Sequence, residues 1–212
     1  MEQTHKELTL VVIKPDALED ALDTKIVSYL VEHIATTEIE VINMKLIKLS
    51  KQVLEELYLN KGDAHIEKCG RKVEQTLKDL QRPIEKSAQE LGREILNIHV
   101  NGFEGKDAIV MLLEGVDAVN KMRELKGSTD PAQAAKGTLR SMFPSGMTLV
   151  DAYLQKKPLR NRIHIPDNKE EADKDVRTFY PLTAELHKSL RDGQGLGEKL
   201  EERQRVSTAQ TL

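Results

Sequence analysis

Short runs of hydrophobic residues mark out the elements in the first part of the chain. Residues 8–13 (LTLVVI) are continuously apolar and rich in β-branched side chains, which predicts a buried strand. Residues 24–34 repeat apolar side chains three and four positions apart, the pattern of an amphipathic helix. Ser50 is placed to cap a further helix that runs through Tyr58. Between the two helices, residues 38–49 predict a second strand, with apolar positions at Ile39, Val41, Met44, Leu46 and Ile47.

Residues 61–96 differ from this pattern because they are rich in Lys, Glu, Gln and Arg. Val73, Leu77 and Leu80 nevertheless recur at helical spacing, which predicts helix in this segment. We interpret residues 61–96 as a charged, solvated helical insertion. The alternative interpretation of the same charges is a surface that binds a protein partner.

Strand and helix patterns alternate again in the second half of the chain. Residues 108–113 predict a strand, Gly115 a turn and residues 116–125 a helix. Beyond them we expect a loop at 127–137, irregular chain between 140 and 160, a short strand within 160–165 and a charged helix at 168–177.

The order of these elements is compatible with an α+β fold of the ferredoxin-like βαββαβ type. Such a sandwich has an antiparallel sheet with helices on one face, to which the helical insertion at about 61–96 would be added. We therefore predict one domain over residues 1–180. Residues 181–212 are polar and glycine-containing, which predicts a C-terminal extension made of a short helix and then a mobile tail.

Charge and length narrow the classes of function. The 212 residues carry a formal net charge of -3, so we expect neither nucleic acid nor an anionic membrane as a partner. An anionic ligand would instead need a local cluster of Lys and Arg. Cys69 is the single cysteine, which excludes an internal disulfide and favours a reducing compartment. Residues 1–7 are polar and no apolar run approaches the ~18 residues of a membrane span, so we expect a cytoplasmic protein.

Three segments combine residues that suit phosphate chemistry. Residues 13–16 (IKPD) directly follow the first strand, Arg123 precedes residues 127–131 (GSTDP) and 137–140 (GTLR), and residues 160–167 (RNRIHIPD) contain one histidine. There is no GxxxxGK[ST] loop, so side chains would have to bind the phosphates. Taken singly, each segment also has an ordinary structural interpretation: a strand exit, a turn and a packed histidine.

Taken together and in this order, the segments resemble the pattern of the nucleoside diphosphate kinases. That pattern is IKPD, LEG, an Arg followed by GxT[ND]P, GT[IL]R and NxxHxxD, and residues 113–115 supply the LEG. The resemblance covers about residues 8–180. It implies an enzyme, a phosphotransferase that moves the γ-phosphate of a nucleoside triphosphate such as ATP to a nucleoside diphosphate through a phosphohistidine, in a ping-pong cycle of nucleotide metabolism.

The resemblance also implies a role for each matching residue. His164 is the nucleophile that accepts the phosphate, Lys14 is catalytic, and Asp175 stands where the family has a glutamate that orients the histidine. Nucleotide-binding residues are Lys14, Tyr58, Arg123, Thr129, Arg140 and Asn161. The family uses Mg²⁺ that bridges the nucleotide phosphates, so no metal-binding residue is assigned in the protein. A homo-oligomer is implied as well.

These residue types suit the reaction for physical reasons. A phosphoryl group in transfer spreads negative charge over its oxygens, which Lys and Arg side chains stabilise. Histidine has a pKa of about 6.5, so one ring nitrogen can be unprotonated at neutral pH. A carboxylate on the other nitrogen then fixes the tautomer and the ring orientation. The other histidines (His5, His33, His65, His99 and His187) lack metal-ligand spacing, and we interpret them as structural or solvated.

Two departures from the family pattern keep a second hypothesis open. Ile165 and Pro166 follow the histidine where the family has a small residue and then Ser, which removes a hydrogen-bonding neighbour. The aromatic residues that stack on the base in the family are not recognisable after Tyr58. The alternative is a catalytically weak or inactive nucleotide-binding scaffold or sensor that uses the insertion or the tail to bind a partner.

Overall fold

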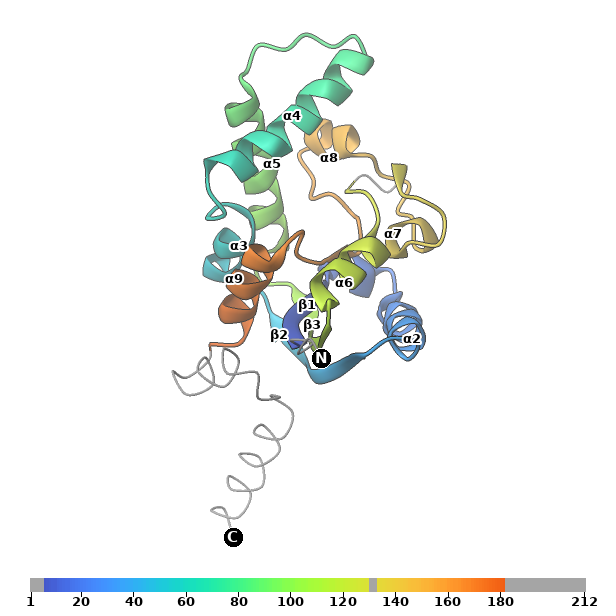
Figure 1. Cartoon of the computed structure of the whole chain (residues 1–212). Helices are drawn as coiled ribbons and strands as arrows, with labels where there is room; N and C mark the ends of the chain where they lie inside the picture. The colour runs from blue at the N-terminus through green and yellow to red at the C-terminus, as the bar shows by residue number, and fades with distance from the viewer. Residues whose placement is uncertain (1–5, 130–132, 182–212) are drawn as a thin grey trace.

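The computed structural model describes residues 6–129 and 133–181 (Figure 1). Asp130 and Pro131 of the predicted GSTDP turn therefore lie outside the described residues, as does the C-terminal extension from residue 182 onward. Within the described ranges, no helix is long and apolar enough to cross a membrane.

In the part of the chain that the structure describes, four strands form one antiparallel sheet in the order β2-β3-β1-β4. They are β1 (Lys6–Ile13), β2 (Ile39–Lys48), β3 (Asp107–Val116) and β4 (Ile163–His164). β1, the strand that the apolar run predicted, lies in the interior of the sheet, between β3 and β4. This order, with a helix between β1 and β2 and another between β3 and β4, confirms the ferredoxin-like βαββαβ prediction.

The helices begin and end close to the predicted positions in the first half of the chain. Their bounds are α1 (Pro15–Glu19), α2 (Asp23–Ile34), α3 (Lys51–Tyr58), α4 (Asp63–Asp79), α5 (Ala88–Phe103), α6 (Ala118–Lys126), α7 (Leu139–Met142), α8 (Leu149–Gln155) and α9 (Lys169–Phe179). As predicted, the Ser50 side chain caps α3 by accepting a hydrogen bond from the backbone N–H of Val53.

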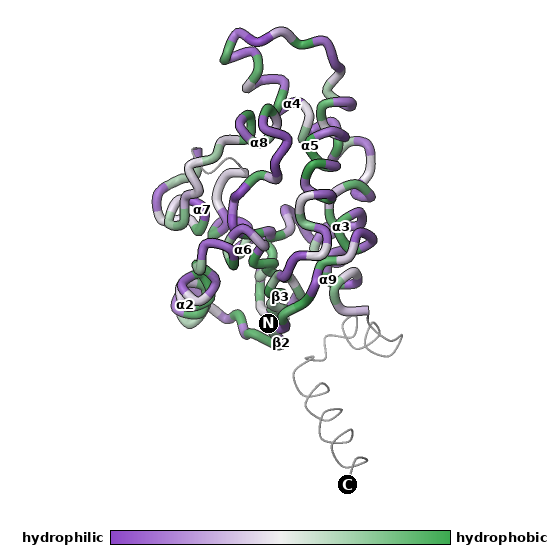
Figure 2. Tube along the Cα trace, turned by 180° about the vertical axis from the view of Figure 1, so that it is seen from behind, coloured by the Kyte–Doolittle hydropathy of each residue, from purple (hydrophilic) through white to green (hydrophobic). Residues whose placement is uncertain are grey.

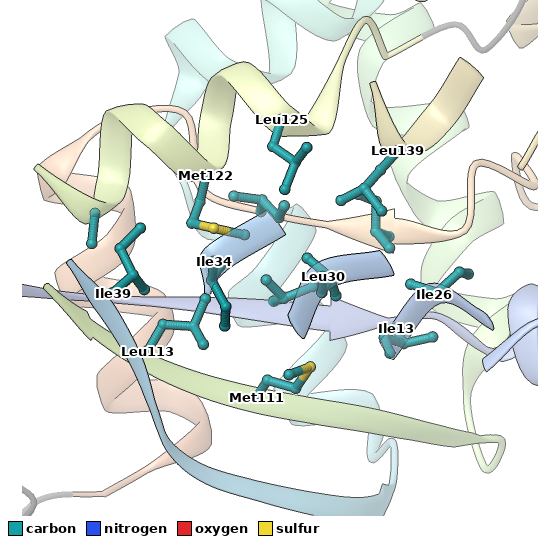
Figure 3. Packing of buried hydrophobic residues seen from close by; sticks show 14 of the residues in the cluster. Ile13, Ile26, Leu30, Ile34, Ile39, Met111, Leu113, Met122, Leu125 and Leu139 are labelled. Atoms are coloured by element: carbon teal, nitrogen blue, oxygen red, sulfur yellow. The ribbon is translucent and has the colours of Figure 1, made fainter. Parts of the chain in front are cut away.

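Helices cover both faces of the sheet, whereas the sequence predicted one. On the first face, α2 and α6 of the βαββαβ repeat pack on alternate residues of β1 and β3, such as Ile13 and Met111 (Figure 3). On the second face, α3, α5 and α9 pack on the intervening residues, including Leu10 and Leu112. β1 is a continuous apolar run because both of its faces are buried.

Helices α4 and α5 form a hairpin whose tip extends away from the sheet, with α8 packed against it (Figure 1). The repeated apolar residues of α4, Val73 and Leu77 among them, are buried against α5 and α8 in a third cluster. A Cβ added to Gly70 would lie 1.6 Å from the carbonyl oxygen of Ala88, so the two helices cross too closely for any side chain there. Figure 2 shows hydrophilic residues over the tip of the hairpin and hydrophobic residues along α5. The segment predicted as a solvated insertion therefore has its own core.

Gly115 does not turn the chain, as the sequence suggested, but lies within β3 opposite Ile39 of β2. A Cβ at Gly115 would lie 2.3 Å from the carbonyl oxygen of Glu38, so the glycine permits close strand pairing. The turn follows at Asp117, which has a φ of 55° before α6. The short helices α7 and α8 occupy a region predicted to be irregular, because 4 and 7 residues give too little periodicity.

The edge strand β2 exposes three of its apolar residues. Val41, Met44 and Leu46 are 40%, 54% and 65% exposed. A β-bulge between Val41 and Asn43 shifts the register of β2 on β3, so that the three residues lie on the same face of the sheet despite their odd spacing.

Candidate active site

A cavity of about 120 Å³ lies between the ends of β1 and β4 and the α4–α5 hairpin. Among the described residues, its walls carry more positive than negative side chains. Six of these described lining side chains are cationic: Lys14, Lys61, Lys68, Lys72, Lys126 and Arg140. Asp167 and Glu171 are the carboxylates among them. Such a concentration of positive charge in a partly enclosed space favours a polyanionic ligand, although the net charge of the whole chain is negative.

His164 lies on the cavity wall, in the two-residue strand β4 opposite Val12 of β1. Helix α9 places Asp175 behind the ring, with Oδ2 2.7 Å from Nε2 of His164. This contact makes Nε2 the nitrogen that carries the proton and leaves the lone pair on Nδ1. Nδ1 has no hydrogen-bond partner among the described residues.

Burial sets the protonation of this pair. It lowers the pKa of His164 to about 4, against the opposing attraction of Asp175, and the charges of Lys61 and Lys126 lower it further. Burial alone would raise the pKa of Asp175, but the hydrogen bond from His164 and the charge of Lys61 outweigh it and hold that pKa below its ordinary value. At neutral pH the site therefore holds a neutral imidazole against a carboxylate.

Lys14 connects three of the predicted segments. Its Nζ donates hydrogen bonds to the carbonyl oxygen of Leu159 at 2.8 Å and to Oδ1 of Asn161 at 2.6 Å. The amide nitrogen of Asn161 in turn donates to the carbonyl oxygen of Thr129 at 3.0 Å. Burial lowers the pKa of Lys14 to about 8, against the opposing charge of Asp16, so the ammonium form still predominates at pH 7.

Arg140 joins the loop after α6 to β4. Its guanidinium donates to the carbonyl oxygens of Gly127 at 3.2 Å, Ser128 at 3.0 Å and Ile163 at 3.1 Å. The Nε atom is buried without a hydrogen-bond partner among the described residues. Burial lowers the pKa of Arg140 to about 10, so the group stays charged at neutral pH.

The α3 and α5 wall of the cavity is aromatic and uncharged. The Tyr58 ring lies 5.4 Å, centroid to centroid, from the ring of His99. His99 accepts a hydrogen bond on Nε2 from the backbone N–H of Leu159 and pairs through Nδ1 with the carbonyl oxygen of Ile95. Burial lowers its pKa to about 3, so it is a neutral, structural histidine, as the sequence predicted. Of the other predicted structural histidines, His5 and His187 lie outside the described residues.

Comparison with known proteins places the chain in a family. A family model described as nucleoside diphosphate kinase matches residues 89–184. The nucleoside diphosphate kinase of Helicobacter pylori strain G27 is 32% identical over 175 residues, which cover 82% of this chain and 96% of that protein. The corresponding protein of Methanocaldococcus jannaschii is 27% identical and is covered to 94%. The chain belongs to the nucleoside diphosphate kinase family.

Solved structures agree with this assignment. The crystal structure of an NDP kinase from Pyrobaculum aerophilum has a TM-score of 0.74 and 26% identity, and the match covers 85% of this chain and 97% of that one. The nucleoside diphosphate kinase of Borrelia burgdorferi, at 18% identity and a TM-score of 0.63, shares the fold. As a nucleoside diphosphate kinase, the protein is a nucleotide-binding phosphotransferase.

The structure brings seven of the eight residues that match the kinase pattern to one place. Lys14, Tyr58, Thr129, Arg140, Asn161 and His164 line the cavity, and Asp175 lies directly behind His164. Arg123 is the exception, because its side chain is exposed on α6 and does not line the cavity. One helical turn further on, the buried Lys126 lines it instead and donates to the carbonyl oxygen of Ile165 at 2.7 Å and to Asp167.

The kinase pattern also missed the contribution of the hairpin. Lys61, immediately before α4, and His65, Lys68 and Lys72 on α4 all line the cavity. Their spacing of four, three and four residues places them on one side of a helix, a stripe that the sequence contains and that could have been recognised. The charged composition of residues 61–96 favours a solvated surface, so it hides this stripe.

Proposed function

We propose that the protein transfers the γ-phosphate through Nδ1 of His164. The observation that carries this proposal is the pairing of Nε2 with Asp175, which leaves the Nδ1 lone pair available in a cavity lined by cations. The low pKa of His164 supports it, because the neutral ring is the nucleophilic form at physiological pH.

In the first half-reaction, the Nδ1 lone pair attacks the γ-phosphorus of a nucleoside triphosphate. An N–P bond forms as the bond from that phosphorus to the bridging oxygen breaks, and the electron pair leaves with the nucleoside diphosphate. The proton on Nε2 stays in place, and Asp175 stabilises the positive charge that develops on the ring. A second diphosphate then attacks the phosphohistidine through its terminal oxygen, and the same steps run in reverse.

Four cations are placed to stabilise the charge on the moving phosphoryl group. Lys14 and Arg140 are fixed by backbone carbonyl groups, so they need little rearrangement when the transition state forms. Lys126 and Lys72 extend the positive surface on the α6 and α4 sides. Thr129 and Asn161, between these cations, would contact the phosphates and the ribose.

We propose that Mg²⁺ enters with the nucleotide and is held by its phosphates. The donor set of the cavity supports this, because the lining carboxylates Asp167 and Glu171 already form ion pairs with Lys126, Lys68 and Lys61. Among the described residues there is no group of three or more His, Cys, Asp or Glu that could hold a metal ion. When bound, the ion would neutralise phosphate charge and orient the triphosphate.

Two further proposals come from the chain's composition and edge strand. The exposed apolar residues of β2 support a homo-oligomer, because an uncovered edge strand with such residues favours pairing with another chain. The single cysteine supports a reducing, cytoplasmic location. A protein partner that binds residues 61–96 remains a hypothesis from the sequence.

Incubation with γ-labelled ATP and Mg²⁺, followed by denaturing electrophoresis, tests the mechanism. We expect an acid-labile, alkali-stable label in the wild-type chain that is absent in His164→Ala and is released by an unlabelled nucleoside diphosphate. His99→Gln is a matched control, because His99 also lines the cavity but is structural. ADP binding without any label would refute the phosphohistidine and favour the nucleotide sensor.

A further inference from the structure

Asp175 is held by a second group besides His164. It lies on α9 with its side chain 1% exposed, and its Oδ2 atom accepts the hydrogen bond from Nε2 of the histidine. A carboxylate so deeply buried needs a further partner to remain ionised. The residues that follow the nucleophile, Ile165 and Pro166, have no side-chain donor to offer it.

Lys61 supplies that partner from the other side of the cavity. It lies in the turn between α3 and α4, and its Nζ is 3.2 Å from Oδ2 of Asp175, the same atom that accepts from His164. The Lys61 side chain is only 3% exposed. Its Nζ also donates to Oε2 of Glu171 at 3.3 Å, so one ammonium group joins two carboxylates of α9.

This arrangement distinguishes Lys61 from Lys72 and Arg140, two other cations of the cavity. Lys72 and Arg140 form no ion pair with a described carboxylate, so they are free to bind a phosphate. Lys61 instead has its charge matched by Asp175 and Glu171. Its geometry therefore directs it toward the histidine pair and away from the nucleotide.

We propose that Lys61 is a positioning residue, which holds the Asp175 carboxylate in the orientation that fixes Nε2–H and directs Nδ1 of His164 into the cavity. The inference rests on the proposed phosphohistidine mechanism. It assigns a role in the reaction to the segment before α4, which the kinase pattern does not contain. Lys61 thereby provides the hydrogen-bonding neighbour that Ile165 and Pro166 do not.

The charge of Lys61 has a second effect on the same pair. The other charged or titratable groups near the His164–Asp175 pair and Lys61 include Glu171 on α9, Lys126 on α6, His65 on α4 and Tyr58 on α3. Against this background, the ammonium group disfavours the imidazolium form and so helps to keep His164 neutral. Removal of the Lys61 charge should therefore raise the pKa of His164.

Three variants of Lys61 separate its hydrogen bond from its charge. Lys61→Met removes both, Lys61→Gln keeps a donor without charge, and Lys61→Arg keeps both. We expect Lys61→Met to slow single-turnover phosphorylation of His164 by about 10- to 100-fold, the usual effect of losing a group that orients a functional histidine. The acid limb of its pH–rate profile should move to higher pH, while the Kd for ADP stays unchanged.

The other two variants and a control complete the test. Lys61→Arg should restore both the rate and the acid limb, whereas Lys61→Gln should recover part of the rate but keep the displaced limb. Lys169→Met is the matched control, because Lys169 lies on the same helix as Asp175 and is exposed in a pair with Asp173. This control should behave as the wild-type chain in every assay.

Two results would overturn the role of Lys61. A weaker ADP affinity in Lys61→Met with an unmoved acid limb would make Lys61 a direct phosphate ligand, and an unchanged rate and limb would leave it without a role. If Lys61→Met has no cooperative melting transition, Lys61→Gln and Lys61→Arg decide the question, because only the glutamine variant should displace the limb. An absence of phosphohistidine in the wild-type and Lys61→Arg chains would instead refute the underlying mechanism.

Discussion

Lys72 of α4 donates a hydrogen bond to the hydroxyl oxygen of Thr129, 2.9 Å away, across the mouth of the cavity. Thr129 belongs to the kinase pattern and Lys72 does not. Burial lowers the pKa of Lys72, and the nearby charges of Lys68 and Arg140 act in the same direction. The Lys72 ammonium group has a neutral hydrogen-bond partner and positive neighbours, so the negative charge of an incoming phosphate would stabilise it.

Replacement of Lys72 by Ala should therefore weaken nucleotide binding. Loss of a hydrogen bond to a charged group costs about 1.5 to 3 kcal/mol, or roughly a 10- to 100-fold higher Kd for ADP. Isothermal titration calorimetry measures this change directly. Lys78→Ala is the control, because Lys78 lies on the same helix but is exposed and paired with Glu74. Equal affinity for ADP in both variants would show that α4 does not bind the phosphates.

A comparison of Lys126→Met with Arg123→Ala tests which cation in the last turn of α6 acts on the phosphate. The kinase pattern assigns that role to Arg123, but Lys126 is the buried residue that lines the cavity. We expect Lys126→Met to lower kcat/KM by at least about tenfold, as loss of a charge-stabilising group does. Arg123→Ala should have a smaller effect in the same coupled assay. The reverse order of effects would support the sequence pattern over the observed side-chain placement.

Stability should fall as the pH drops below about 6.5, because the folded pKa values of His65, His99 and His164 are lowered. The folded pKa values are about 3 for His99 and about 4 for His164. Below about pH 6.5 the unfolded chain binds protons that the folded chain does not, so each histidine contributes up to about 1.4 kcal/mol of lost stability per pH unit. This loss continues until the pH reaches the folded pKa.

Urea unfolding at pH 7.5, 6 and 5 measures this dependence. His99→Gln should make the free energy of unfolding less dependent on pH between 6.5 and 5, since one of these titrations is removed. His33→Gln, at an exposed position, should leave the dependence as in the wild-type chain. If the glutamine at position 99 leaves the slope intact, the ring of His99 is not buried in the neutral form.

Leu46→Asp should dissociate the homo-oligomer that we propose. Leu46 is 65% exposed on the edge strand β2, so an aspartate is tolerated in a monomer but would be unfavourable against a second apolar surface. Light scattering coupled to size-exclusion chromatography would report the mass. Lys48→Asp, on the same strand, controls for the added negative charge, because Lys48 is exposed and pairs with Asp107. A wild-type chain that elutes as a monomer would refute the proposal.

The sequence predicted the parts of the fold that depend on local patterns. The apolar run of β1 and the Ser50 cap of α3 are visible without any tertiary information. Burial on the second face of the sheet was not predicted, because it depends on how α3, α5 and α9 pack on the sheet, which no local pattern specifies. The exposed residues of β2 lie at the edge of the sheet, and the pattern of the strand alone does not show what covers them.

The candidate site was predictable in a similar way, to the extent that its residues belong to motifs. The pattern located His164, Asp175 and the Lys14–Asn161 pair, whose mutual contacts the structure supplies. It could not locate Lys61 or Lys72, because their contacts with Asp175 and Thr129 cross 114 and 57 residues of chain. Only the docking of the hairpin against the sheet domain creates these contacts.

The crossing point of α4 and α5 has a consequence for how such a site can diversify. Gly70 allows the two helix backbones to touch. This contact fixes the distance between α4 and α5, and with it the position of Lys68 and Lys72 in the wall of the cavity that contains His164. Substitutions along this single helix face could change the electrostatic surroundings of the reaction without disturbing any strand. A side chain larger than hydrogen at position 70 would push the whole row of charges outward at once.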